Sequence, residues 1–221
     1  MATIEQTGTE VAEAPPASPA PAHGHDDHGG HGSSAMLTNG KLAMWLFLAS
    51  DCLFFGAFIS AYLLYRGRPQ TGPTPKELFD IPFTSATSFI LLMSSLAMVL
   101  ALAAIQRGDH RRFRLWTLAT ALFGATFIAG QIYEFTHFYR EGLKINTNLF
   151  GSTFYVLTGF HGAHVALGIL WLLSLWGMSM QGRLGTEKSE SVEIAGLYWH
   201  FVDVVWIVIF TVIYLMPQPG K

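Results

Sequence analysis

The residues of this sequence that could do chemistry are acids and histidines placed inside long apolar segments. His200 and Asp203 lie three positions apart in the run Ile194–Met216, whose 23 residues are enough to cross a bilayer. A charged side chain at the centre of a membrane helix costs about 2.5–3.5 kcal/mol on insertion scales. We therefore expect both side chains to face other helices, a partner protein or a wet cavity, or to pair with each other.

A second acid, Asp51, interrupts another apolar run. The residues three and four positions away on a helix are aromatic or aliphatic: Phe47, Leu48, Phe54 and Phe55. A carboxyl among such side chains loses hydration. One interpretation is a carboxyl that binds and releases a proton, and the other is a structural hydrogen bond to a neighbouring helix. The residues leave both open.

Glu134 is a third acid, placed near the end of an apolar segment. Gln131 and His137 lie three positions before and after it, so the three side chains share one face of a helix. We favour a carboxylate that packs between helices or lies at the membrane interface over a functional group.

His161 and His164 form a pair on one helix, and His200 with Asp203 lies on the next. Histidines on separate helices can hold a haem or a metal ion. Such a site also needs a third or fourth ligand at defined geometry, which this pattern does not supply. We therefore favour a structural polar core over metal ligation.

Five apolar segments must position these side chains. The chain has 221 residues, of which 51% are apolar and 13% are charged, against about 25% charged in a soluble domain. We predict an all-α, polytopic membrane bundle of five transmembrane helices within residues 36–221. The helices are expected at about 41–65, 83–105, 115–139, 149–177 and 194–216.

Residues 1–35 have a different composition. They are rich in Ala, Pro, Gly, Ser and His and contain no Lys or Arg, which predicts a disordered tail and not a signal peptide. Four histidines of the tail are candidates for weak metal binding, although a solvated tract is favoured. They are His23, His25, His28 and His31.

The short loops predict an orientation in the membrane. Five spans place the two ends of the chain on opposite sides, and Lys and Arg divide almost equally between them. A compact cluster of four arginines favours a cytoplasmic N-terminus and an external C-terminus, because basic loops tend to lie on the cytoplasmic side. The cluster consists of Arg107, Arg111, Arg112 and Arg114. The net charge of −2 and the scattered basic residues give no sign of nucleic-acid binding.

Two classes of function are compatible with these features. One is a proton-coupled transporter that uses an intramembrane carboxyl, and the other is a non-redox subunit of a larger complex. Transporters usually show paired repeats and helices interrupted by Gly or Pro. The sequence shows no such repeat and no Pro inside the five expected helices, which weakens the transporter interpretation.

Four segments resemble one known family, subunit III of haem-copper terminal oxidases. Tyr198–Trp206 resembles its signature, as does Phe150–Val165. Gln131–Phe135 is similar to a helix-end segment of the family, and Ser50–Phe55 to its Ser-acid-x-x-Phe-Phe segment. These pieces occur in the family's order over residues 41–216.

The resemblance implies a fold and a role. The chain is similar to the shorter, five-helix bacterial form, in the bacterial plasma membrane. Members of the family pack against subunit I of their oxidase, protect it from inactivation during turnover and help to sustain proton uptake. Haems and copper are expected in subunits I and II and none in this chain, with phospholipid bound to it.

The resemblance also bears on the electron donor and on Asp51. We expect cytochrome c as the donor, with subunit III of a quinol oxidase as the alternative. In many members the acid at the position of Asp51 is a glutamate that reacts with carbodiimide. Aspartate is one methylene shorter, so its reach differs.

Overall fold

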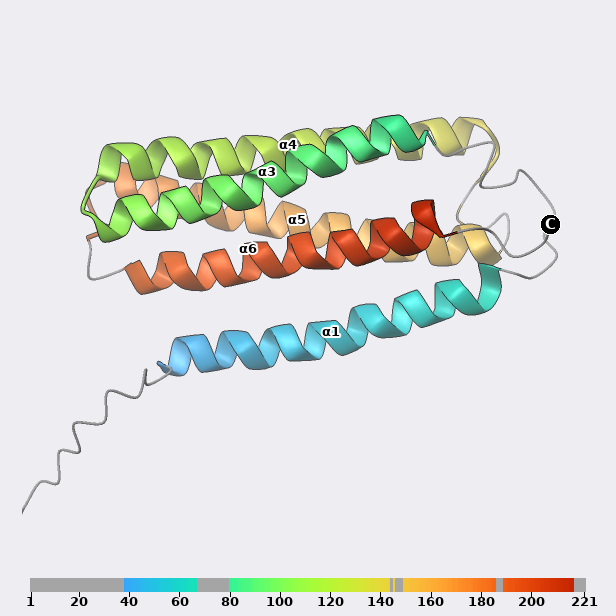
Figure 1. Cartoon of the computed structure of the whole chain (residues 1–221), viewed down its shortest axis with the longest axis horizontal. Coiled ribbons are helices and arrows are strands. Elements are labelled where there is room, and N and C mark those ends of the chain that lie inside the picture. Colours follow the sequence, from blue (N-terminus) through green and yellow to red (C-terminus); the bar gives the residue numbers. More distant parts are fainter. Residues whose placement is uncertain (1–37, 67–79, 144, 146–148, 186–188, 217–221) are drawn as a thin grey trace, which may run out of the picture. The chain divides into compact units, whose positions relative to one another are not determined.

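The described part of the chain is a bundle of long helices (Figure 1). The computed structural model describes residues 38–66, 80–143, 145, 149–185 and 189–216, and these residues contain no strand. The helices are α1 (Asn39–Arg66), α3 (Ile81–Gln106), α4 (His110–Arg140), α5 (Leu149–Met180) and α6 (Ser189–Phe210), which continues as the π-helix η2 (Thr211–Leu215). Within these described residues, five helices are long and apolar enough to cross a membrane. The predicted all-α, five-helix membrane fold is confirmed.

The helices extend beyond the expected apolar cores. We expected the third span near residue 115, but α4 begins at His110. The Asp109 carboxylate accepts a hydrogen bond from the backbone N–H of Arg112 at 3.0 Å, so it caps the helix. The arginine-rich segment expected to be a loop is therefore largely helical. The turn before it passes through Gly108, whose positive φ of 75° suits glycine.

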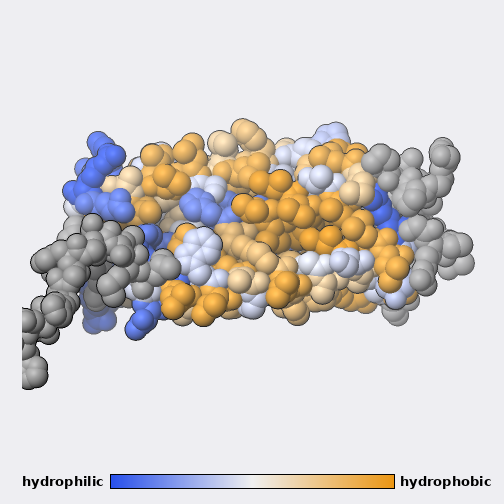
Figure 2. Space-filling view, turned by 60° about the horizontal axis from the view of Figure 1, so that its bottom comes forward, coloured by the Kyte–Doolittle hydropathy of each residue, from blue (hydrophilic) through white to orange (hydrophobic). Residues whose placement is uncertain are grey.

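The contacts between helices place α6 at the centre of the bundle. It packs against α3, α5 and α1, while α4 packs against α3 and α5. α1 lies along one side of the group and contacts α5 and α6 (Figure 1). The visible face is mainly apolar along its length with hydrophilic residues gathered near one end (Figure 2), as expected of a surface that faces lipid.

Trp199 fixes the position of α6 against three other helices. Its indole is 1% exposed, and its Nε1–H donates to Ser94 Oγ of α3 at 2.9 Å. A Cβ added at Gly124 of α4 would lie 2.7 Å from this ring, and one added at Gly168 of α5 would lie 2.8 Å from it. Glycine is therefore required at both positions for the ring to fit. The tail histidines, His23, His25, His28 and His31, lie outside the described residues.

Candidate functional site

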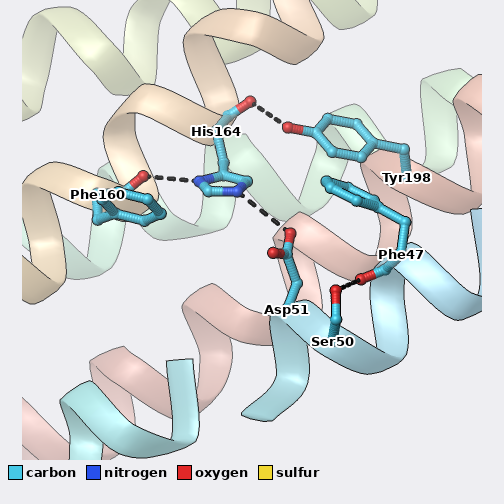
Figure 3. Close-up of polar contacts among 6 residues, drawn as sticks. All are labelled: Phe47, Ser50, Asp51, Phe160, His164 and Tyr198. Carbon is cyan, nitrogen blue, oxygen red and sulfur yellow. Dashed lines mark hydrogen bonds and ion pairs between the residues drawn. The ribbon is translucent and has the colours of Figure 1, made fainter. Parts of the chain in front are cut away.

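Asp51 and His164 meet inside the bundle, between α1 and α5 (Figure 3). His164 Nε2 lies 3.2 Å from Asp51 Oδ2, an ion-pair contact whose angles are not those of a regular hydrogen bond. The two side chains are only 10% and 13% exposed. The structure thus joins an acid and a histidine that are 113 positions apart in the sequence. We call them the Asp51–His164 pair.

The contact between His164 and Phe160 indicates which ring nitrogen carries a hydrogen. Its Nδ1 lies 2.9 Å from the carbonyl oxygen of Phe160, which can only accept, so Nδ1 carries a hydrogen. In a neutral imidazole Nε2 would then present a lone pair to the carboxylate at 3.2 Å, which is repulsive. The contact is attractive when one further proton lies on Nε2 or on Asp51. The Asp51–His164 pair thus brings two ionisable groups together between α1 and α5.

Aromatic rings surround the pair and limit the access of water. The ring centroids of Phe160 and Phe55 lie 5.0 and 5.2 Å from that of His164, and Tyr198 stacks on it at 6.5 Å. The Tyr198 hydroxyl donates to the carbonyl oxygen of His164 at 3.0 Å (Figure 3). In such a low-dielectric setting the attraction between acid and imidazole is stronger than at a wet surface.

His200 and Asp203 do not pair with each other, so the sequence-based pairing is wrong. The Ser95 hydroxyl of α3 lies 2.5 Å from His200 Nδ1 and occupies it. Asp203 is 2% exposed, and neither carboxylate oxygen has a regular hydrogen-bond partner among the described residues, although Ser95 is within reach. Serine from the neighbouring helix therefore stands between these two groups.

His161 is fully buried and makes aromatic contacts. Its ring stacks on Trp206 at 4.9 Å and meets Phe127 edge-on at 5.8 Å. Neither ring nitrogen has a hydrogen-bond partner within the described segments. Trp206 in turn donates from Nε1 to Ser88 Oγ at 2.8 Å. His161 thus belongs to the packed contact between α4, α5 and α6.

Glu134 and Gln131 form a separate buried group on α4. Glu134 Oε1 accepts from Thr84 Oγ1 at 2.6 Å and from the Tyr214 hydroxyl at 3.2 Å. Gln131 Nε2 donates to the carbonyl oxygen of Thr158 at 2.6 Å. These contacts tie α4 to α3, to α5 and to the π-helix η2, which fits the packing role favoured from the sequence.

The histidines of the bundle lie in separate surroundings. No group of three or more His, Cys, Asp or Glu side chains converges among the described residues. His164 uses both ring nitrogens within the protein, and His200 uses Nδ1. Cys52 is exposed.

Sequence reasoning missed the partners of the candidate residues. Phe160 lies four positions before His164 on the same helix, a neighbouring position that the sequence analysis did not use. Tyr198 belongs to a recognised segment, but nothing in its spacing showed that it contacts His164. Ser95 and Thr84 were not among the candidate residues of the sequence analysis. Tyr214 lies beyond the signature segment, and its contact with Glu134 depends on the π-helix. The contacts of Tyr198, Ser95, Thr84 and Tyr214 join separate helices, so helical periodicity could not reveal them.

The fold and the buried groups define a multi-pass α-helical membrane protein whose acids and histidines are engaged in pairing and packing. The model of one protein family, described as cytochrome c oxidase subunit III, matches residues 25–218. The chain belongs to this family, subunit III of haem-copper terminal oxidases, as its signature segments predicted.

Relatives of two kinds resemble the chain. Cytochrome c oxidase subunit 3 of Bacillus sp. (strain PS3) is 40% identical over 82% of this chain and 88% of the relative. Quinol oxidase subunit 3 of Bacillus spizizenii is 37% identical over 81% of this chain and 88% of the relative. Cytochrome bo(3) ubiquinol oxidase subunit 3 of Pseudomonas aeruginosa is 36% identical over 87% of this chain and 91% of the relative. The chain is thus a membrane subunit of a terminal oxidase, of cytochrome c or quinol type.

Proposed function

We propose that the chain is the non-redox subunit III of a bacterial, proton-pumping oxidase that takes electrons from cytochrome c. It packs mainly against subunit I, which with subunit II holds the haems and copper of the complex. The 40% identity to a cytochrome c oxidase subunit supports the donor, and the engaged histidines support a role without redox chemistry. The quinol type is the alternative, supported by relatives at 37% and 36% identity.

The electron donor can be tested on the purified complex. We expect oxygen consumption with reduced cytochrome c and little with a short-chain quinol. Difference spectra of the reduced complex would identify the haems of the partner subunits in the same sample. Turnover with quinol alone would assign the chain to the quinol type.

The Asp51–His164 pair is our candidate for the contribution to proton uptake. The observation that carries this proposal is the 3.2 Å contact between Asp51 and His164 in an aromatic setting, which is attractive when the two groups share one proton. The proton can lie on the carboxyl or on the imidazole without a change of net charge. A change in the local field can therefore move it at low cost, whereas removing it would leave a buried anion. These properties suit a group that stores a proton close to a proton-uptake path.

The substitution Asp51→Asn separates this role from packing. The Asn amide can donate to a neutral Nε2, so the contact between α1 and α5 is kept while the exchangeable proton is lost. We expect normal assembly, slower proton uptake and faster loss of activity during turnover. Ser50→Ala is the matched control, because the Ser50 hydroxyl bonds only to the carbonyl oxygen of Phe47 on its own helix. If Asp51→Asn pumps protons and retains activity as the wild type does, Asp51 is structural only.

We further propose a cytoplasmic N-terminus in the bacterial plasma membrane. The start of α1, the turn between α3 and α4 and the end of α5 lie at the same end of the bundle (Figure 1). Four arginines lie in or beside that α3–α4 turn, and basic residues favour the cytoplasmic side. An alkaline phosphatase fused after Lys221 should be active, because it would be external. An inactive phosphatase with an active cytoplasmic reporter at that position would reverse the orientation.

A further inference from the structure

A basic cleft lies at the end of the bundle where α4 begins and α5 ends. Its volume is about 840 Å³, and its walls combine three arginines and the carboxylate of Asp109 with apolar side chains. Arg111, Arg112 and Arg114 come from the first turns of α4, and Trp176 and Met180 from the last turns of α5. None of these residues takes part in the Asp51–His164 pair.

Two of the three arginines keep an uncompensated positive charge. Arg112 is paired with Asp109, Nε to Oδ2 at 3.2 Å. Arg114 donates to neutral groups, from Nε to the carbonyl oxygen of His110 at 3.1 Å and from a terminal nitrogen to Met180 Sδ at 3.2 Å. No carboxylate of the described residues forms an ion pair with Arg111 or Arg114. The bonds of Arg114 hold its guanidinium across the cleft, toward α5.

Apolar side chains line the cleft on the side that continues into the membrane. Leu115 and Leu118 follow the arginines on α4, and Trp176 faces them from α5. Leu115 is 62% exposed and Met180 55%. α4 has 31 residues, about 46 Å at 1.5 Å per residue, whereas the hydrocarbon core is about 30 Å thick. The first turn of α4 therefore lies at the level of the lipid headgroups, with Leu115 and Leu118 below it.

We propose that this cleft binds one anionic phospholipid, with its phosphate on Arg111 and Arg114 and an acyl chain along Leu118 and Trp176. The guanidinium groups match a phosphate because each can donate two hydrogen bonds to its oxygens. Basic pockets between membrane helices take anionic headgroups in this way, and tryptophan favours the interface. A free phosphate would use the arginines but leave the apolar wall without a function.

The test is a lipid titration of the purified oxidase complex. The complex is depleted of lipid in mild detergent, titrated with dioleoyl phosphatidylglycerol, and the bound molecules are counted by native mass spectrometry. Each arginine near a membrane contributes about a fivefold gain in affinity, so Arg111→Gln with Arg114→Gln should weaken one site about 30-fold. The matched control removes two other exposed arginines from the same end of the bundle, Arg107→Gln with Arg183→Gln, and should leave the count unchanged.

Further variants and competitors keep the result interpretable. Arg111→Lys with Arg114→Lys should retain much of the binding, which separates lost charge from misfolding. Trp176→Ala should weaken the binding of phosphatidylglycerol even though the arginines of the cleft remain. Phosphatidylethanolamine should bind less tightly, and inorganic phosphate should not compete at equal concentration.

Three outcomes would overturn the proposal. One is an unchanged count of bound phosphatidylglycerol in the double glutamine variant. The second is full displacement of the lipid by inorganic phosphate, which would make the cleft a simple anion site. The third is loss of another oxidase subunit from that variant with all lipid retained, which would make the cleft a protein contact.

Discussion

Gly168→Ala should destabilise the bundle because α5 and α6 touch at this position. The added methyl would lie 2.8 and 2.9 Å from two atoms of the Trp199 ring and 3.2 Å from Tyr198 Cε1. The indole cannot move away freely, since it is 1% exposed, bonded to Ser94 and bounded by Gly124 on another helix. The strain must therefore be taken up by α5 or α6.

The expected size follows from two opposing effects. Overpacking a core by one methyl group costs about 1–3 kcal/mol. Alanine is favoured over glycine inside a helix by about 0.5–1 kcal/mol, which offsets part of this cost. The net loss should be about 1–2 kcal/mol, or a fall in melting temperature of about 2–8 °C for a chain of this size.

The assay is thermal unfolding in detergent, followed by circular dichroism. Gly177→Ala is the matched control on the same helix, because a Cβ at Gly177 meets nothing within 4 Å. It should raise the melting temperature slightly. Trp199→Phe in the Gly168→Ala background should cost less than the two single changes added together, since both act on the same contact. Equal stabilisation by Gly168→Ala and Gly177→Ala would refute the tight contact with Trp199.

Two further predictions concern other polar contacts. His164→Leu should increase carbodiimide labelling of Asp51, measured by mass spectrometry, because the proton of the pair then has only the carboxyl to bind. Unchanged labelling would contradict a proton shared with the imidazole. Trp206→Phe removes the donor to Ser88 and should lower the free energy of unfolding by about 1 kcal/mol. Adding Ser88→Ala should cost little more, and two additive losses would show that this hydrogen bond contributes nothing.

The number and order of the helices could be predicted because a membrane imposes a simple rule. Each span must be an apolar run that satisfies its own backbone hydrogen bonds, and the five runs are plain in the sequence. Helix ends were less predictable. The arginines after Gln106 suggested a loop, but membrane helices extend into the headgroup region, where Arg112 and Arg114 are well solvated and Asp109 provides a cap.

The buried acids could be identified from the sequence, but their partners could not. Asp51 was singled out because a carboxyl inside a membrane run needs a partner, yet its choice of His164 depends on how α1 lies against α5. The short spacing of His200 and Asp203 suggested a local pair. The antiparallel packing of α3 and α6 instead brings Ser95 to His200. Helical periodicity relates residues on one helix, whereas the contacts of Asp51 with His164 and of Ser95 with His200 join different helices.

The attachment of α1 explains why Asp51→Asn should affect function before assembly. α1 buries few side chains, but polar contacts hold it at both ends as well as at the centre. Lys41 Nζ lies 2.8 Å from Glu193 Oε2 at its start, and Arg66 donates to the carbonyl oxygen of Met216 at its end. With both ends held, α1 should stay in place when the contact at its middle is altered. Asp51→Asn should therefore leave an intact subunit.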